Sequence, residues 1–107
     1  MDKNKCDKIV EFFEQFYERP VLFTGKSFDF AWTIQYVRGF HEALNIMGEI
    51  GPSYDDIRSA YSRRGWTDAY FGAADEMKSK GMDGDQITRE IISVEIDVWN
   101  AHARRMT

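Results

Sequence analysis

Prolines, glycines and helix-capping residues divide this sequence of 107 residues into five segments with apolar side chains at helical spacing. The expected helices span residues 4–18, 28–47, 54–64 and 67–80, and a last one runs from a cap at Asp83 or Asp85 to Arg105. Only residues 21–23 are expected to form a short extended piece. The pattern predicts an all-α fold, a single compact domain of about five helices over residues 1–107.

Residues with a known local preference mark the ends of these helices. Arg19 precedes Pro20, and a residue before proline disfavours helical backbone, so the first helix is expected to end there. Ser27 is the expected cap of the second helix, and Gly48 is expected to follow that helix in the left-handed conformation. Ser53 and the acid three positions later resemble a capping box at the start of the third helix.

The large apolar side chains are mostly aromatic. The sequence has 8 phenylalanines, 5 tyrosines and 3 tryptophans but only two leucines. We therefore expect an aromatic-rich core, in which rings and isoleucines fill the interior. Trp32 and Phe40 are expected to lie in this core, where removing either ring would cost about 3–5 kcal/mol.

The net charge of −4 and the pI near 5.1 argue against binding of nucleic acid, which requires a basic surface. Residues 66–100 hold eight acids and three bases. Bases gather elsewhere, at Arg58, Arg63, Arg64, Arg104 and Arg105. Poles of opposite sign are therefore expected, and the acidic pole favours a basic protein as the partner.

Cys6 is the only cysteine, which excludes an intrachain disulfide and a cysteine-rich metal site. It stands near Lys5 and Lys8, a setting that lowers the pKa of a thiol, although a frayed helix end is the simpler interpretation. The first residues are charged, and no apolar run is long enough to cross a bilayer. We expect neither a signal peptide nor a membrane span, and a cytoplasmic location.

The helix over residues 28–47 is apolar around roughly two-thirds of its circumference, which predicts a central position. His41 falls within this apolar arc. It is interpreted as a hydrogen-bonded core histidine, with a ligand-binding or catalytic histidine as the alternative. Gly39 lies at the border of the arc, where its missing side chain could admit another backbone closely.

The last helix carries two apolar stripes. The first holds Ile87, Ile91, Val94 and Val98, and the second holds Ile92, Ile96, Trp99 and Met106. Because monomers rarely expose large apolar patches, the second stripe could form a homodimer. Glu95 and His102 lie between the stripes, and Glu95 is expected to be desolvated, as a structural hydrogen-bonding group or as a functional acid.

The sequence contains no motif for catalysis or for a bound metal. His41 and Glu42 resemble the start of a zinc-protease helix, but Asn45 stands where the second histidine is required. The acids around Gly84 are too closely spaced for a calcium loop, and there is no phosphate loop or nucleophile elbow. We expect no cofactor, no metal and no enzymatic activity.

A candidate partner-binding surface lies around the helix over residues 67–80. Trp66 follows two arginines, and these residue types dominate interface hot spots, although the ring could instead fold back onto the core. A glycine within a helix destabilises it by up to about 1 kcal/mol relative to alanine. Gly72 is therefore explained either by the close approach of a partner or by a neutral substitution that the fold tolerates. The predicted binding residues are Trp66, Asp68, Gly72, Asp75, Glu76, Asp83 and Asp85.

Two short segments, ERPVLFTGKS at residues 18–27 and GFHEAL at residues 39–44, resemble a family of short bacterial proteins. That family carries Arg-Pro-Gly-Met-Tyr-x-Gly followed by a helix with Gly-Tyr-x-x-Ala, and some members look like immunity proteins of toxin systems. Here Val21, Leu22 and Phe23 stand where the family has Gly, Met and Tyr. The resemblance implies an immunity role and brings no catalytic residues with it.

These observations favour a small acidic protein that binds and inhibits another macromolecule, as an immunity protein or an anti-defence protein does. The alternative is a structural or regulatory homo-oligomer that forms through the last helix. A third hypothesis is a small-molecule binder or enzyme built around His41, Glu95 and His102. That hypothesis requires the three side chains to converge in one pocket.

Overall fold

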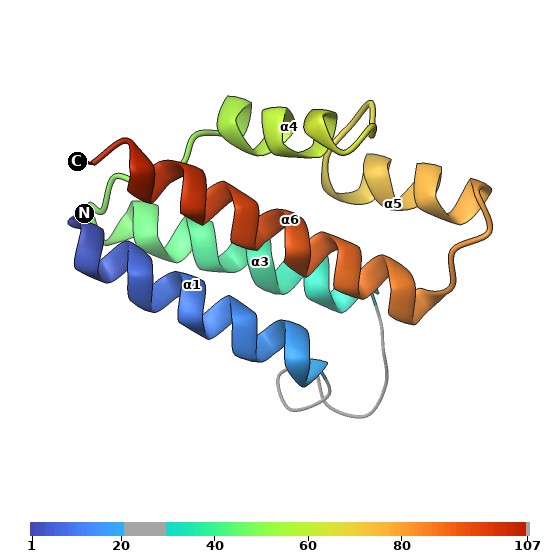
Figure 1. Cartoon of the computed structure of the whole chain (residues 1–107), viewed down its shortest axis with the longest axis horizontal. Helices are drawn as coiled ribbons and strands as arrows, with labels where there is room; N and C mark the ends of the chain where they lie inside the picture. Colours follow the sequence, from blue (N-terminus) through green and yellow to red (C-terminus); the bar gives the residue numbers. More distant parts are fainter. Residues whose placement is uncertain (21–29, 107) are drawn as a thin grey trace.

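The computed structural model describes residues 1–20 and 30–106, which form five α-helices and no strand. The helices are α1 (Lys3–Glu18), α3 (Phe30–Ile46), α4 (Tyr54–Arg63), α5 (Tyr70–Ser79) and α6 (Gly84–Arg104) (Figure 1). The all-α prediction is confirmed. The expected extended piece at residues 21–23 and the expected cap Ser27 lie outside the described residues.

Side chains cap the beginnings of three helices. Asp2 accepts a hydrogen bond from the backbone amide three residues on, at the start of α1. The predicted capping box is confirmed in α4, where Ser53 and Asp56 each accept a hydrogen bond from the other's backbone amide. A second capping box, of Asp83 and Gln86, begins α6, so Asp83 rather than Asp85 is the cap of this helix.

Gly48, which directly follows the last turn of α3, has a φ of +77°, and Gly65 and Gly81 have φ of +91° and +86° beyond α4 and α5. This left-handed conformation suits glycine and satisfies carbonyls at the end of a helix. The prediction for Gly48 is confirmed.

The start of α5 differs from the prediction. The helix begins at Tyr70 rather than at Thr67. The amide and hydroxyl of Thr67 donate hydrogen bonds to the carboxylate of Glu76 on α5, which holds the preceding residues in a turn. Tyr70 has a φ of +52°, the one positive value at a residue other than glycine among those described. Local helix propensity does not encode this contact across the turn.

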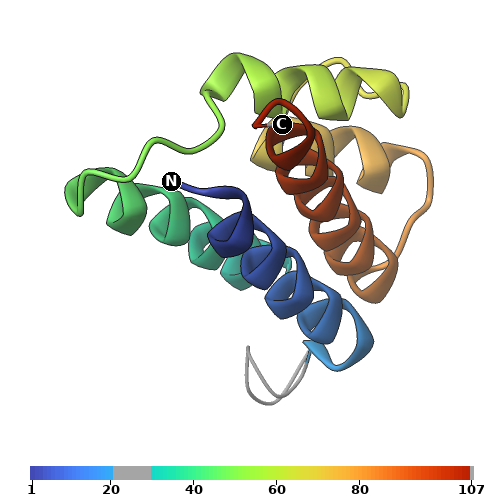
Figure 2. The ribbon, with the colours of Figure 1, turned by 60° about the vertical axis from the view of Figure 1, so that its left-hand side comes forward.

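The central helix is α6, and the prediction that the helix over residues 28–47 is central is wrong. Figure 2 shows α6 running between the pair α1 and α3 on one side and the pair α4 and α5 on the other. α6 contacts all four of these helices, and its most extensive contact is with α1. The apolar face of α3 is wide because it covers both α6 and the aromatic side chains of α1.

Aromatic rings join α1 to α3, as the composition predicts. Phe12 stacks on Phe40 with ring centroids 5.9 Å apart, and Phe13 meets the same ring edge-on at 5.2 Å. Phe16 packs edge-on against Tyr36 at 5.3 Å. Such edge-to-face and offset pairs add to the stabilisation from buried area, so the α1–α3 contact is built mainly from rings.

Two expectations about burial are wrong. Trp32 is 57% exposed on α3 rather than part of the core. The second apolar stripe of α6 is not a free face, because Ile92 and Trp99 are fully buried and Ile96 and Met106 pack against the same core. Since α6 lies between two pairs of helices, both of its stripes are covered within the chain, and the reason for a dimer through α6 disappears.

None of the helices in the described part of the chain combines the length and the apolar composition needed to cross a membrane.

Candidate functional site

A cluster of polar side chains lies where α3 meets α6. The buried carboxylate of Glu95 accepts a hydrogen bond from the indole of Trp99 at 2.9 Å, and the same oxygen contacts Nε2 of His41. The imidazole of His41 stacks on the indole at 5.4 Å with an interplanar angle of 12°. Glu95 is 1% exposed, so the expectation of a desolvated, hydrogen-bonded carboxylate is confirmed. Because a buried carboxylate needs such partners, the cluster fixes the position of the histidine ring.

His102 does not join this cluster. Its ring meets the edge of Trp99 at 6.0 Å, and its Nε2 lies 3.2 Å from the backbone carbonyl oxygen of Ile50. Only His41 and Glu95 of the three residues are in contact with each other, and His102 is absent from the lining of the groove described next. The hypothesis of a centre formed by all three side chains is therefore wrong.

His41 lines a groove between α3 and α4, with a volume of about 560 Å³. Figure 2 shows α3 and α4 on either side, joined by the segment of residues 47–53. Nε2 of His41 is held by Glu95, so Nδ1 is the ring nitrogen left for a molecule in the groove. Other lining residues are Arg38, Glu42, Leu44, Asn45, Tyr54, Ile57 and Tyr70. The groove can therefore offer a positioned imidazole to a small polar ligand.

Arg38 and Tyr70 belong to this groove, although neither was predicted from the sequence as a site residue. The guanidinium of Arg38 lies over the ring of Tyr70, 5.8 Å from its centroid, in a cation–π contact. Tyr70 adopts the left-handed backbone conformation that is rare for a bulky residue, and such strain is often found at functional sites. The helical spacing of Arg38 and His41, three residues apart, could have indicated a shared face. No sequence signal marks the backbone of Tyr70.

Two phenols pack beside the cluster. Burial raises the pKa of Tyr61 and that of Tyr70 well above the ordinary value, and the negative charge of Glu95 raises both further. Both phenols therefore stay protonated around neutral pH. As neutral hydroxyl groups, they add no further negative charge to the surroundings of the buried carboxylate.

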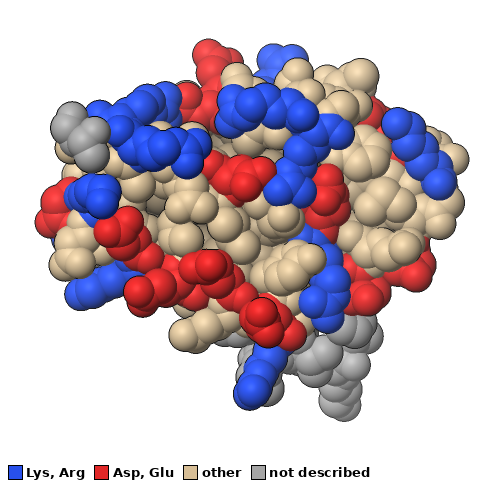
Figure 3. Space-filling model, in the orientation of Figure 1, with Lys and Arg blue, Asp and Glu red and all other residues tan. Residues whose placement is uncertain are grey.

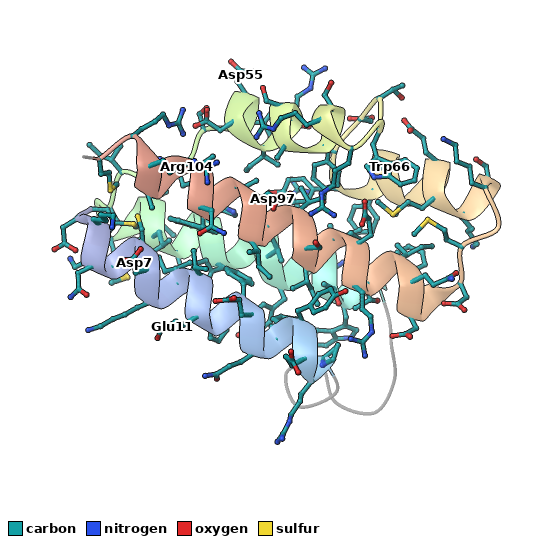
Figure 4. The ribbon with its side chains drawn as sticks, in the orientation of Figure 1. Asp7, Glu11, Asp55, Trp66, Asp97 and Arg104 are labelled. Carbon is teal, nitrogen blue, oxygen red and sulfur yellow. The ribbon has the colours of Figure 1, made fainter. Side chains whose placement is uncertain are left out.

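Trp66, the expected anchor for a partner, is half-buried against its own chain. Its indole nitrogen donates a hydrogen bond of 2.9 Å to Glu90, and the ammonium of Lys80 lies 5.0 Å above its ring (Figure 4). The adjacent Arg64 reaches α6, where it pairs with Asp97 at 2.7 Å and with Glu90 at 3.0 Å. The arginine and tryptophan pair that resembled a hot spot thus folds back onto the core.

Most of the acids in the predicted binding set already serve the fold. Glu76 accepts the hydrogen bonds from Thr67, which lower the pKa of its carboxyl group. Asp83 caps α6, and Asp85 pairs with the guanidinium of Arg89, one turn later, at 3.1 Å. Asp75 is exposed, and no ion pair or hydrogen bond of its side chain occurs within the described residues.

Asp68 explains the glycine in the first turn of α5. Its carboxylate accepts a hydrogen bond from the amide of Ala69 at 2.8 Å, which holds the side chain against the first turn. A Cβ added at Gly72 would lie 2.8 Å from Cβ of Asp68 and closer still to the carboxylate. The space above Gly72 is therefore filled by Asp68 rather than kept open for a partner.

A line of acidic side chains runs along α1, and we call it the acidic stripe; it is made of Asp7, Glu11, Glu14 and Glu18. All four side chains are exposed. Figure 3 shows acidic side chains along α1, with basic ones gathered over α4 and the end of α6, and Figure 4 labels two members of the stripe. Asp7 makes a long ion pair with Lys3 at 3.8 Å, whereas the other three have no partner in the part of the chain that the structure describes. The spacing i, i+4, i+7 and i+11 would have revealed the stripe from the sequence.

Within residues 1–20 and 30–106, no three side chains of the His, Cys, Asp and Glu types gather closely enough to hold a metal ion. Comparisons with known proteins add no relative to this description. No family model matches the chain, and neither does any curated protein or any solved structure.

Proposed function

We propose that this protein is a small acidic inhibitor that binds a basic protein and neutralises it, in the manner of an immunity or anti-defence protein. The observation that supports this function is the acidic stripe on α1. Charges without intramolecular partners contribute little to the stability of the fold, and they remain free to pair with a partner's bases.

The geometry of the stripe suits recognition of a basic surface. Four acids on one face of a helix extend over roughly 16 Å, from the rise of about 1.5 Å per residue. The helix is held by α6 and by the aromatic contacts with α3, so the charges need little ordering when a partner binds. A line of like charge also accelerates association with an oppositely charged protein, and an inhibitor of this kind needs no catalytic groups.

The test is an affinity capture from the lysate of the source organism, at low and at moderate salt, followed by identification of the bound proteins. The Glu11→Lys/Glu14→Lys variant removes the centre of the stripe. The Glu42→Lys/Asp75→Lys variant is the matched control, because it has the same net charge and changes two exposed acids on α3 and α5 that have no partner among the residues the structure describes.

We expect the wild type and the control to retain a basic protein that the Glu11→Lys/Glu14→Lys variant loses, with weaker retention as salt increases. Loss in the control alone would move the docking surface to α3 or α5. If no basic protein is retained by the wild type, the inhibitor function is rejected.

A homo-oligomer is the second candidate, and an apolar patch at the end of α3 favours it. Ile46, Met47 and Ile50 are 78%, 73% and 78% exposed within five residues of sequence. Apolar side chains that are grouped in this way on a surface commonly mark an interface. Light scattering with multi-angle detection tests it: a dimer that becomes a monomer in Ile46→Lys/Ile50→Lys supports this function, and a monomeric wild type rejects it.

A further inference from the structure

Cys6 lies in the first turn of α1 and is fully buried, so the expectation of a frayed helix end is wrong. The expected lowering of its pKa is also wrong, because burial raises the pKa of this thiol. Its sulfur lies 3.4 Å from Sδ of Met1 and 3.7 Å from Sδ of Met106. Sγ of Cys6 is therefore in contact with two thioether sulfur atoms, one from the start of the described chain and one from its end. We call these three residues the sulfur cluster.

The thiol of Cys6 cannot donate a hydrogen bond to both neighbouring thioethers at once. It carries one proton, which can be donated to one thioether at a time, and thioethers are weak acceptors. The remaining sulfur pair therefore has no hydrogen between its atoms. An ion at the position of the proton could contact all three sulfur atoms at once.

We propose that Cys6, Met1 and Met106 form a binding site for a soft monovalent metal ion, of which Cu(I) is the biological example. Thiolate and thioether sulfur select Cu(I), whereas hard cations such as Mg²⁺ and Ca²⁺ require oxygen ligands. When the ion binds, the thiol proton leaves to solvent and one metal–thiolate bond forms in place of the S–H bond.

The distances fit such an ion. Metal–sulfur bonds of about 2.3 Å in a trigonal or tetrahedral site place two sulfur atoms about 3.8–4.0 Å apart. The two observed separations, from Sγ of Cys6 to Sδ of Met1 at 3.4 Å and to Sδ of Met106 at 3.7 Å, need to increase by only a few tenths of an ångström. Met106 is only partly buried and follows the last turn of α6, so the sulfur cluster borders solvent at this side chain.

The electrostatics also select a charge of +1. A monovalent ion bound to a thiolate is neutral as a unit, so its burial carries no large desolvation cost, whereas a divalent ion would leave a buried positive charge. The single carboxylate of Glu49 pairs with both the amino group of Met1, at 3.5 Å, and Lys5, at 2.7 Å, so these three groups keep a net positive charge, which further disfavours an ion that adds positive charge. The apolar environment that makes the free thiol hard to ionise is therefore compatible with a neutral complex.

The first experiment titrates the full chain with Ag(I), a redox-inert soft ion, and with Cu(I) under anaerobic conditions against a chromophoric Cu(I) chelator. The wild type is expected to bind one equivalent of either ion. Cys6→Ser is expected to abolish this binding, and Met106→Leu, which keeps a similar volume without the sulfur, to weaken it at least tenfold. Met82→Leu is the matched control, a partly buried methionine at the far end of α6, and is expected to bind as the wild type does.

The second experiment needs no variant. With 13C-labelled methionine methyl groups, Ag(I) is expected to shift the resonances of Met1 and Met106 and to leave those of Met47, Met77 and Met82 in place. Wild-type affinity in Met106→Leu would show that the thiol alone binds the ion and would overturn the proposal. Binding that persists in Cys6→Ser, or shifts at the other three methionines instead, would overturn it as well.

Discussion

Glu95 on α6 hydrogen-bonds the imidazole of His41 on α3, although the carboxylate is buried and the two residues lie 54 positions apart in the sequence. The contact joins the two helices beside the groove and aligns the imidazole with the indole of Trp99. A polar group at this depth has no water to replace a lost partner, so each member of the cluster depends on the others.

Replacing Glu95 with leucine is expected to lower the free energy of unfolding by about 2–4 kcal/mol, because His41 and the indole of Trp99 both lose their partner. Urea denaturation measures this change. The exposed Glu42→Leu on α3 is the control and should stay within about 0.5 kcal/mol of the wild type. Adding His41→Phe to Glu95→Leu should recover part of the lost stability. If Glu95→Leu and Glu42→Leu were equally stable, Glu95 would not stabilise the contact between α3 and α6.

Alanine at Gly72 is expected to destabilise the protein by about 1–3 kcal/mol, because its Cβ would collide with Asp68. Alanine at Gly39 is the matched control in α3, where nothing lies within 4 Å, and should stabilise the protein by about 0.5–1 kcal/mol. Thermal unfolding compares the two, and the cost of Gly72→Ala should largely disappear in an Asp68→Gly background, which removes both the carboxylate and the Cβ that the new methyl group meets. A stabilised Gly72→Ala would show that the space above Gly72 is free.

Asp56 should make stability depend on pH. The hydrogen bond from Arg105, followed by that from the amide of Ser53, holds the pKa of Asp56 well below its usual range. A pKa that is lower in the folded protein stabilises it above the unfolded value of about 4, and this stabilisation is lost as the pH falls further. Asp56→Asn should therefore lower Tm at pH 7, and the difference from the wild type should shrink towards pH 2.

The comparison for this pH dependence is Asp55→Asn, a neighbouring exposed acid in the first turn of α4. Its difference from the wild type should be smaller at pH 7. If the Tm of Asp56→Asn were lower than that of the wild type by the same amount from pH 7 down to pH 2, the ion pair of Asp56 with Arg105 would contribute nothing to stability.

Trp99 and Trp32 should respond very differently to replacement by alanine. Trp99 is fully buried, packs against Phe40 and His41 of α3 and is hydrogen-bonded, so its loss should cost about 3–5 kcal/mol. The exposed Trp32 should cost less than about 1 kcal/mol. Chemical denaturation of both variants measures the contrast, and similar costs would place Trp32 in an interface that buries it.

The positions of helix ends could be predicted because short-range chemistry determines them. Ser53, Asp83 and Gly48 each act within one helical turn, so the capping boxes and the left-handed glycine are readable from neighbouring residues. The start of α5 was missed because it depends on Glu76 reaching back across a turn to Thr67, nine positions earlier.

Burial and site geometry depend on how helices are arranged, which periodicity does not specify. The apolar arc of α3 includes Trp32, but neither α6 nor α1 covers that position. The two stripes of α6 allowed either a dimer or a central helix, and only the packing of four neighbours decides between them. Likewise, the meeting of Cys6 with Met106, 100 positions apart, follows from the pairing of α1 with α6 and from no local signal.

The position of α6 in the sequence also affects how quickly the protein can fold. Among the helices of residues 1–20 and 30–106, the one that packs against the other four comes last, and its most extensive contact is with α1, the first. The α1–α6 contact joins residues far apart in the chain and raises the contact order relative to bundles whose neighbours pair in sequence order, which slows folding in comparison with them. During translation, the apolar faces of α1, α3, α4 and α5 emerge from the ribosome before their common partner, and we expect chaperones to meet them first.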